Sequence, residues 1–191
     1  MLFPQIPDYT VNHHAHIFAA WAASRAASVK NCRFSVKVGQ AILGEWSFAN
    51  DYLNFAESDK SQLLPTKKHF DEFHREWRNE IIELAAKHDL GFTHGVAAKL
   101  INIYLKALYL NFFGKAAESV NAIHPPIDSV LLVELCKQNF GAKGKFWREA
   151  NLKRWSKFSS KEYEEVIHLI RLSLPDNQGL WTIEQYWQGH Q

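Results

Sequence analysis

The sequence has little cysteine and no long apolar run. Its two cysteines among 191 residues, Cys32 and Cys136, stand far apart, so neither a disulfide framework nor a cysteine-ligated zinc or iron–sulfur site is expected. Unpaired cysteines are typical of a reducing compartment. No stretch approaches the roughly 18 apolar residues of a membrane-spanning helix, and residues 1–8 lack the basic start of a secretory signal. We therefore expect a cytoplasmic protein without a membrane partner.

Repeats, low-complexity tracts and linkers rich in glycine, serine or proline are also absent, which predicts a single domain over residues 1–191. The sequence has no phosphate-binding Gly-Lys-Ser/Thr loop, Gly-x-Ser-x-Gly elbow or Cys–His nucleophile pattern. His13, His14 and His16 are neighbours, but their spacing on a helix does not aim all three at one ion. We expect neither a metal nor a cofactor.

What the sequence does contain is helical periodicity. Apolar residues recur at three- and four-residue steps, and they predict helices over residues 11–29, 34–43, 66–87, 96–113, 127–139 and 161–172. The helix over 96–113 is apolar on nearly every face, which predicts that it lies at the centre of a helical bundle. No alternation of period two lasts long enough for a sheet. The predicted fold class is all-α, with short helices in residues 45–64 and an aromatic tail at 180–187.

The first predicted helix carries large apolar residues and an arginine one turn apart. Ile17, Phe18 and Trp21 fall at helical spacing, and Arg25 follows Trp21 by four positions. An arginine on an apolar helix face needs a carboxylate or a backbone partner. We expect Arg25 to have a structural role of this kind.

A glycine-flanked turn separates two of the predicted helices. Gly91 and Gly95 bracket Thr93 and His94, and glycines permit positive φ and close approach of the backbone to another molecule. The free N–H groups at the start of the following helix are suited to holding a phosphate. Lys99 lies one turn inside that helix, near its positive end.

A pair of prolines stands before the next helix. His124 precedes Pro125 and Pro126, and Asp128 follows at the expected helix N-terminus, where aspartate is a preferred N-cap. His124 and His94 flank the two candidate residues, Lys99 and Asp128. Each histidine is a candidate for phosphate contact or proton transfer, or an ordinary turn residue.

Residues 95–99, Gly-Val-Ala-Ala-Lys, and residues 126–130, Pro-Ile-Asp-Ser-Val, together resemble the helix-hairpin-helix DNA glycosylase superfamily, in particular its 8-oxoguanine and other lyase-active members. The resemblance covers about residues 66–139. Ala97 stands where the family usually has a second hairpin glycine, the interval from lysine to aspartate is longer than in the common members, and the iron–sulfur cysteines of some branches are absent.

The resemblance implies a helix-hairpin-helix element and a DNA glycosylase, with possible AP-lyase activity, that excises a damaged or modified base. Lys99 would be the nucleophile, and Asp128 would stabilise positive charge developing on the sugar. The structural alternative is that Lys99 reaches water or pairs with Asp128, and that Asp128 only caps a helix. In that case the chain would be a catalytically silent helical module that binds nucleic acid or protein.

A basic stretch follows the candidate site. Residues 137–161 hold eight basic residues and one acidic residue. Aromatic residues are interleaved with them, as in surfaces that bind phosphates and stack bases, although a solvated helix face with core aromatics has the same pattern. We expect a DNA-binding surface here, which includes Lys143, Lys145, Arg148, Lys153, Arg154 and Lys157.

Overall fold

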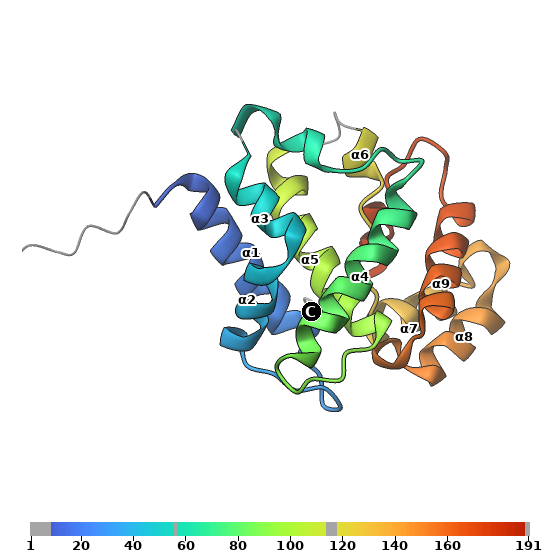
Figure 1. Ribbon diagram of the computed structural model, residues 1–191. Helices are drawn as coiled ribbons and strands as arrows, with labels where there is room; N and C mark the ends of the chain where they lie inside the picture. The colour runs from blue at the N-terminus through green and yellow to red at the C-terminus, as the bar shows by residue number, and fades with distance from the viewer. Residues whose placement is uncertain (1–8, 56, 114–117, 190–191) are drawn as a thin grey trace, which may run out of the picture.

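The computed structural model describes residues 9–55, 57–113 and 118–189, so the start of the chain considered above lies outside it. The regular structure of these residues is helical, apart from one isolated antiparallel bridge between Val29 and Cys32. The predicted all-α class is therefore confirmed (Figure 1). The α-helices are α1 (Val11–Ala27), α2 (Val36–Glu45), α3 (Ser47–Asn54), α4 (Phe70–Ala86), α5 (His94–Phe113), α6 (Glu118–Asn121), α7 (Ser129–Lys137), α8 (Gly144–Lys153) and α9 (Ser160–Ser173). The 3₁₀ helices are η1 (Glu57–Leu63), η3 (Phe140–Ala142), η4 (Trp155–Lys157) and η5 (Leu180–Tyr186).

Helix α5 lies at the centre of the bundle, as its composition predicts. In Figure 1 it runs between the group α1–α3 and the group α7–α9. Leu100 and Leu108 are buried, and Ile103 is half-buried because it borders a pocket described below. A helix that is apolar on most faces needs neighbours on every side.

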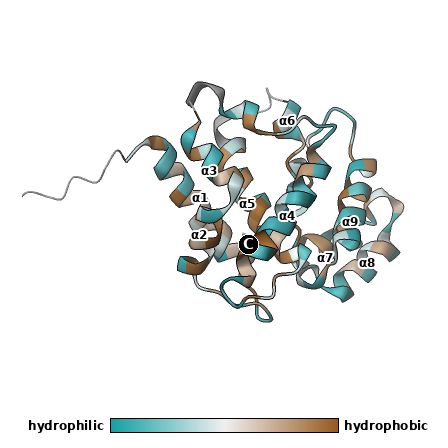
Figure 2. Ribbon diagram, viewed as in Figure 1, coloured by the Kyte–Doolittle hydropathy of each residue, from teal (hydrophilic) through white to brown (hydrophobic). Residues whose placement is uncertain are grey.

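Helices α4 and α5 are joined by a turn at residues 87–93. Hydrophilic and hydrophobic stretches alternate along α4 (Figure 2), and its core face includes Trp77 and Ile81. The positive φ of the turn belongs to Asp89, at 56°, and to neither glycine. The turn thus lies where the sequence predicts it. The residue in the left-handed conformation is Asp89, whereas the sequence suggested Gly91 or Gly95.

The orientation of α1 differs from the prediction. Its buried face consists of small residues, Ala19, Ala20, Ala23, Ser24 and Ala27, because small side chains let α1 lie close against α5. Ile17, Phe18 and Trp21 are therefore turned outward and are 46%, 56% and 48% exposed. Arg25 is also exposed and forms no ion pair with any described residue. The carboxylate partner that the sequence suggested for Arg25 is therefore not found among the described residues.

Most of the basic stretch folds into the helix α8 and the short 3₁₀ helix η4. Apolar periodicity predicted neither of these elements. Trp147, Trp155 and Phe158 from this stretch are buried, so they belong to the core and are not free to stack on bases. Within the described part of the chain, no helix is both long enough and apolar enough to cross a membrane.

Candidate functional site

The structure brings Lys99 and Asp128 together from two different helices. Lys99 comes from the second turn of α5, and Asp128 is the N-cap of α7. The Lys99 Nζ atom donates to Asp128 Oδ2 at 3.2 Å, across 29 positions of sequence. The proline pair before Asp128 leads the chain back to the start of α5.

Lys99 is held in largely apolar surroundings. Its side chain is 10% exposed, and its Nζ atom lies 4.5 Å from the centre of the Trp155 ring, within range of a cation–π contact. Burial lowers the pKa of the Lys99 ammonium, and the neighbouring Asp128 carboxylate opposes that shift. The amine is thus closer to its neutral, nucleophilic form than an exposed lysine.

Asp128 makes three kinds of contact. Its Oδ1 atom accepts from the Leu131 N–H at 3.0 Å, which is the cap of α7, and the Trp187 indole N–H donates to Oδ1 and Oδ2 at 3.2 and 3.0 Å. Together with Lys99, these donors fix the position of the carboxylate. The Asp128 carboxylate thus lines the pocket while several hydrogen bonds hold it in place.

The pair lies in the wall of a pocket of about 310 Å³, which is lined by Ala26, Lys99, Ile103, Lys106, Ala107, Pro126, Asp128, Glu184 and Trp187. Ligand pockets typically measure roughly 300–1,000 Å³ and combine apolar walls with a few polar groups. This pocket is at the small end of that range. Lys106 and Glu184 form a second ion pair in it, and burial raises the pKa of Glu184 against the opposing effect of Lys106.

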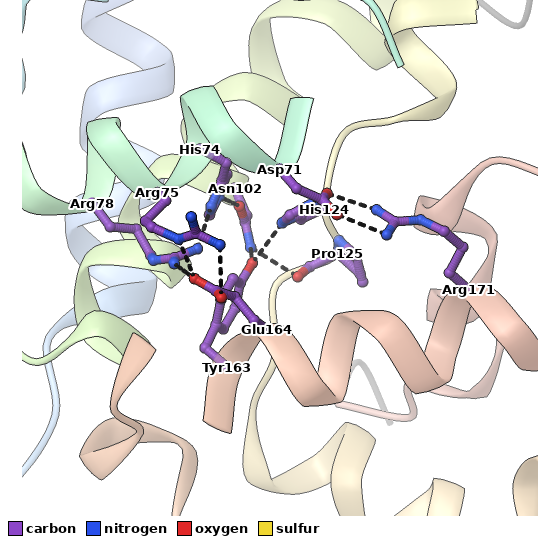
Figure 3. Close-up of polar contacts among 10 residues, drawn as sticks. All are labelled: Asp71, His74, Arg75, Arg78, Asn102, His124, Pro125, Tyr163, Glu164 and Arg171. Atoms are coloured by element: carbon purple, nitrogen blue, oxygen red, sulfur yellow. Dashed lines mark hydrogen bonds and ion pairs between the residues drawn. The ribbon is translucent and has the colours of Figure 1, made fainter. Parts of the chain in front are cut away.

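A polar network with a buried centre connects α5 to the loop that leads to Asp128 (Figure 3). It connects α4, α5, α9 and the loop before α7, and it consists of Asp71, His74, Arg75, Arg78, Asn102, His124, Pro125, Tyr163, Glu164 and Arg171. His74 and His124 are buried with ring centroids 4.3 Å apart. Burial lowers the pKa of both histidines, His74 more strongly.

The partners determine the direction of each hydrogen bond in the network. Arg78 has no acceptor, so its Nη1 donates to His74 Nδ1 at 2.8 Å, and the proton of His74 must lie on Nε2, which donates to Asn102 Oδ1 at 2.7 Å. The Asn102 amide then donates to the Tyr163 hydroxyl and to the Pro125 carbonyl, both at 2.9 Å. Both donations come from the residue one turn after Lys99.

The chain of donors ends on a carboxylate. The Tyr163 hydroxyl donates to His124 Nδ1 at 3.1 Å, and His124 Nε2 donates to Asp71 Oδ1 at 2.9 Å. Although burial alone would raise the pKa of Asp71, hydrogen bonds from His124 and Arg171 hold it far below its usual range. Both histidines are therefore neutral, and the loop that ends at Asp128 is fixed to α5 through Pro125.

The structure corrects two of the predicted DNA contacts. His124 is 2% exposed and is used by the network, so it cannot reach a phosphate. The Gly95 N–H donates to the Phe158 carbonyl, and a Cβ on Gly95 would lie 1.9 Å from the Trp155 carbonyl oxygen. Gly95 thus allows close approach of η4 and does not leave a free N–H.

The other predicted DNA contacts in this turn are Thr93, His94 and Gly91, and they differ in whether their polar groups are already used within the protein. The Thr93 hydroxyl donates to the Ser156 carbonyl and accepts from the Val96 N–H. Burial lowers the pKa of His94, and the side chain is half-buried. Gly91 is exposed with open space around it. Only Gly91 keeps the open backbone that the sequence predicts for this turn.

The basic stretch is exposed but partly neutralised. Lys145 pairs with Glu149, and Lys153 pairs with Glu162. The remaining predicted contacts, Lys143, Arg148, Arg154 and Lys157, form no ion pair with a described residue. The described residues contain no group of histidine, cysteine and acidic side chains placed to hold a metal ion.

Three residues of the pocket, and Trp155 beside Lys99, were not identified from the sequence. Trp155 and Trp187 contact the candidate pair, and Lys106 and Glu184 form the second ion pair. Lys106 was visible as one of the few polar residues in the apolar segment 96–113, which is a signal for a buried polar contact. Trp155, Trp187 and Glu184 have no such signal.

Compared with models of protein families, with curated proteins and with solved structures, the chain matches none of them.

Proposed function

We propose that the protein is a DNA glycosylase with lyase activity that excises a damaged or modified base. The observation that carries the proposal is the 3.2 Å contact between the Lys99 amine and the Asp128 carboxylate in the wall of a small, mostly apolar pocket. The resemblance of residues 95–99 and 126–130 to the helix-hairpin-helix glycosylases supports it. The unpaired thiols of Cys32 and Cys136 are compatible with a cytoplasmic setting.

The chemistry requires a flipped nucleotide in the pocket. Lys99 releases a proton to solvent, which its lowered pKa favours, and its neutral amine attacks the C1′ carbon of the sugar while Asp128 stays ionised. The N-glycosidic bond breaks, and the base leaves with the electron pair and takes up a proton. Opening of the C1′–O4′ bond then gives a Schiff base between C1′ and Lys99. Loss of a proton from C2′ and cleavage of the C3′–O bond complete strand scission by elimination.

The Asp128 carboxylate has an electrostatic task in this scheme. Positive charge develops on the sugar as the glycosidic bond lengthens, and a fixed negative charge beside C1′ stabilises it. Hydrogen bonds from Trp187 and the α7 backbone hold Asp128 in place, so little reorganisation is needed.

Borohydride trapping tests the proposal. Duplex oligonucleotides that each carry one damaged base or an abasic site are incubated with the protein, and sodium borohydride reduces any Schiff base to a stable adduct visible on a denaturing gel. We expect an adduct with wild-type protein and none with Lys99→Gln. Lys106→Gln is the matched control because it removes the other amine of the same pocket. Absence of an adduct with every substrate would refute the lyase proposal, and loss of trapping in the control alone would assign the nucleophile to Lys106.

One observation favours a catalytically silent binding module instead. Lys99 and Asp128 are fully paired in the structure, as a purely structural ion pair would be. In that case Lys99→Met would leave every measurable interaction with DNA unchanged, and the wild-type protein would release no base.

A further inference from the structure

The exposed side of α1 and the turn that leads to α2 carry positive charge without any compensating acid. Residues 9–44 contain no aspartate or glutamate. Arg25, Lys30, Arg33 and Lys37 are all exposed, and none of them forms an ion pair with a described residue. By contrast, the basic stretch in α8 and η4 loses part of its charge to Glu149 and Glu162.

Two aromatic rings lie on the same side of α1. Phe18 and Trp21 are 56% and 48% exposed, and their ring centroids are 6.1 Å apart with an interplanar angle of 32°. Large aromatic side chains are usually buried, and an exposed pair with a cation one turn away provides both a stacking platform and a phosphate contact. The core does not need these rings, because alanines form the buried face of the helix.

This side of α1 adjoins the pocket that contains Lys99. Ala26, which follows Arg25 directly, lines that pocket and is intermediate in exposure between the buried alanines and the outward-facing residues. Successive residues of a helix are about 100° apart, so Ala26 stands at the border of the exposed face. A chain lying along the exposed face of α1 is therefore next to a residue of the pocket wall.

We propose that Phe18, Trp21, Arg25, Lys30, Arg33 and Lys37 form a nucleic-acid-binding surface, the α1–α2 surface, along which a DNA strand enters the pocket. The choice of DNA rests on the proposed function, and the polyanionic, base-bearing character of the ligand rests on the surface itself. The cations contact phosphates and the two rings stack on bases. A lipid surface is disfavoured because the cations are spread over a helix end, a turn and a second helix beside a pocket.

Fluorescence anisotropy with undamaged, fluorescein-labelled single-stranded and duplex DNA tests this surface without any chemistry at Lys99. Arg25, Lys30, Arg33 and Lys37 are changed together to serine. The control changes Lys67, Lys68 and Lys87 to serine, because these lysines are also exposed and lie outside both predicted DNA-binding segments. Each lost phosphate contact makes the plot of log affinity against log salt shallower by about 0.9 for duplex DNA. We expect a decrease of about 2–4 in that slope for the surface variant and a smaller change for the control.

The rings have a separate signature. Phe18→Ala combined with Trp21→Ala should weaken binding of single-stranded DNA at least about fivefold, the lower limit for loss of one stacked base, and should leave the salt slope unchanged. All of these residues are exposed, so circular dichroism and the melting temperature should match the wild type in every variant.

The outcomes separate this inference from the glycosylase proposal. DNA binding that depends on the α1–α2 surface, without borohydride trapping, supports the surface and refutes the enzyme. Trapping with DNA affinity unchanged in the surface variant refutes the surface alone. Wild-type binding to phosphatidylserine vesicles that is lost in the variant, together with no DNA binding, would assign the surface to a membrane and overturn the inference.

Discussion

Acidification should destabilise the protein well before its carboxylates are protonated. His74 and His124 are buried and neutral, and burial lowers the pKa of each below its ordinary value. In the unfolded chain both rings regain a pKa of about 6.5. The unfolded state therefore binds more protons than the folded state below that pH, so stability is fully present above about 6.5 and is lost as the pH falls.

The magnitude follows from linkage. Each histidine that is neutral when folded and protonated when unfolded contributes a slope of about 1.4 kcal/mol per pH unit. The two network histidines together give up to about 2.7 kcal/mol per unit below the pKa of the unfolded chain. Since small domains are stable by roughly 5–15 kcal/mol, two pH units are enough to remove much of the stability.

Urea denaturation at pH 7.5, 6.5, 5.5 and 5.0, followed by circular dichroism, measures this slope. His74→Gln is the informative variant, because its amide oxygen can accept from Arg78 and its NH₂ group can donate to Asn102, as the neutral ring does. We expect that variant to lose up to about 1.4 kcal/mol per pH unit of the slope, the contribution of one such histidine, while the other buried histidines keep theirs. His69→Gln, which removes an exposed histidine just before the same helix, is the matched control.

Two results would contradict this account. One is a wild-type slope under about 0.7 kcal/mol per unit between pH 6.5 and 5.5, half of what a single such histidine contributes. The other is a His74→Gln protein with the full slope, because the assigned neutral ring would then not be the group that titrates.

Further predictions concern single contacts. Asn102→Ala should lower the free energy of unfolding by at least about 3 kcal/mol in urea titrations, because His74, Tyr163 and the Pro125 carbonyl lose buried partners worth roughly 1–3 kcal/mol each; a loss below 1 kcal/mol would contradict the network. Gly95→Ala should cost about 1–3 kcal/mol by overpacking against the Trp155 carbonyl, whereas Gly91→Ala, with open space around it, should be close to neutral by the same measurement. Ser159→Ala removes the capping box of α9 and should lower stability by about 1 kcal/mol in thermal unfolding. Changing Lys143, Arg148, Arg154 and Lys157 to alanine should weaken binding to all DNA sequences about equally in anisotropy titrations if the basic stretch binds phosphates.

Periodicity predicts the helices that bury large side chains. Segments 66–87, 96–113, 127–139 and 161–172 correspond to α4, α5, α7 and α9 within a few residues at each end. Their core faces repeat at helical spacing, and that repeat is visible in the sequence. The same signal fails for α1, where alanines make the close contact and the large residues are outside. Phe18 and Trp21 could bury more apolar surface than alanine, although close packing of two helices favours the smaller residue.

The polar network was not predictable in the same way. His74 and Arg78 are buried on α4, where the sequence pattern assigns charged residues to the outer face. Apart from the hydrogen bond between these two residues, their partners are 28 to 86 positions away. Only the folded arrangement shows that most of these buried donors have acceptors, with the Arg78 Nε atom as the exception, and such pairing is what makes the burial tolerable. Lys99 and Asp128 were identified because a local motif marks each of them.

The position of Asp128 shows why a structural and a catalytic role need not exclude each other here. As the N-cap of α7 it must accept from the Leu131 N–H, and asparagine caps a helix about as well as aspartate does. Asp128→Asn therefore keeps the cap while it removes the negative charge beside Lys99. If Asp128 were only a cap and an ion-pair partner, this variant would change stability slightly and have no activity to lose. If the carboxylate stabilises charge on the sugar, base release slows by orders of magnitude with the fold intact, and only a charge acting at the reacting carbon accounts for that combination.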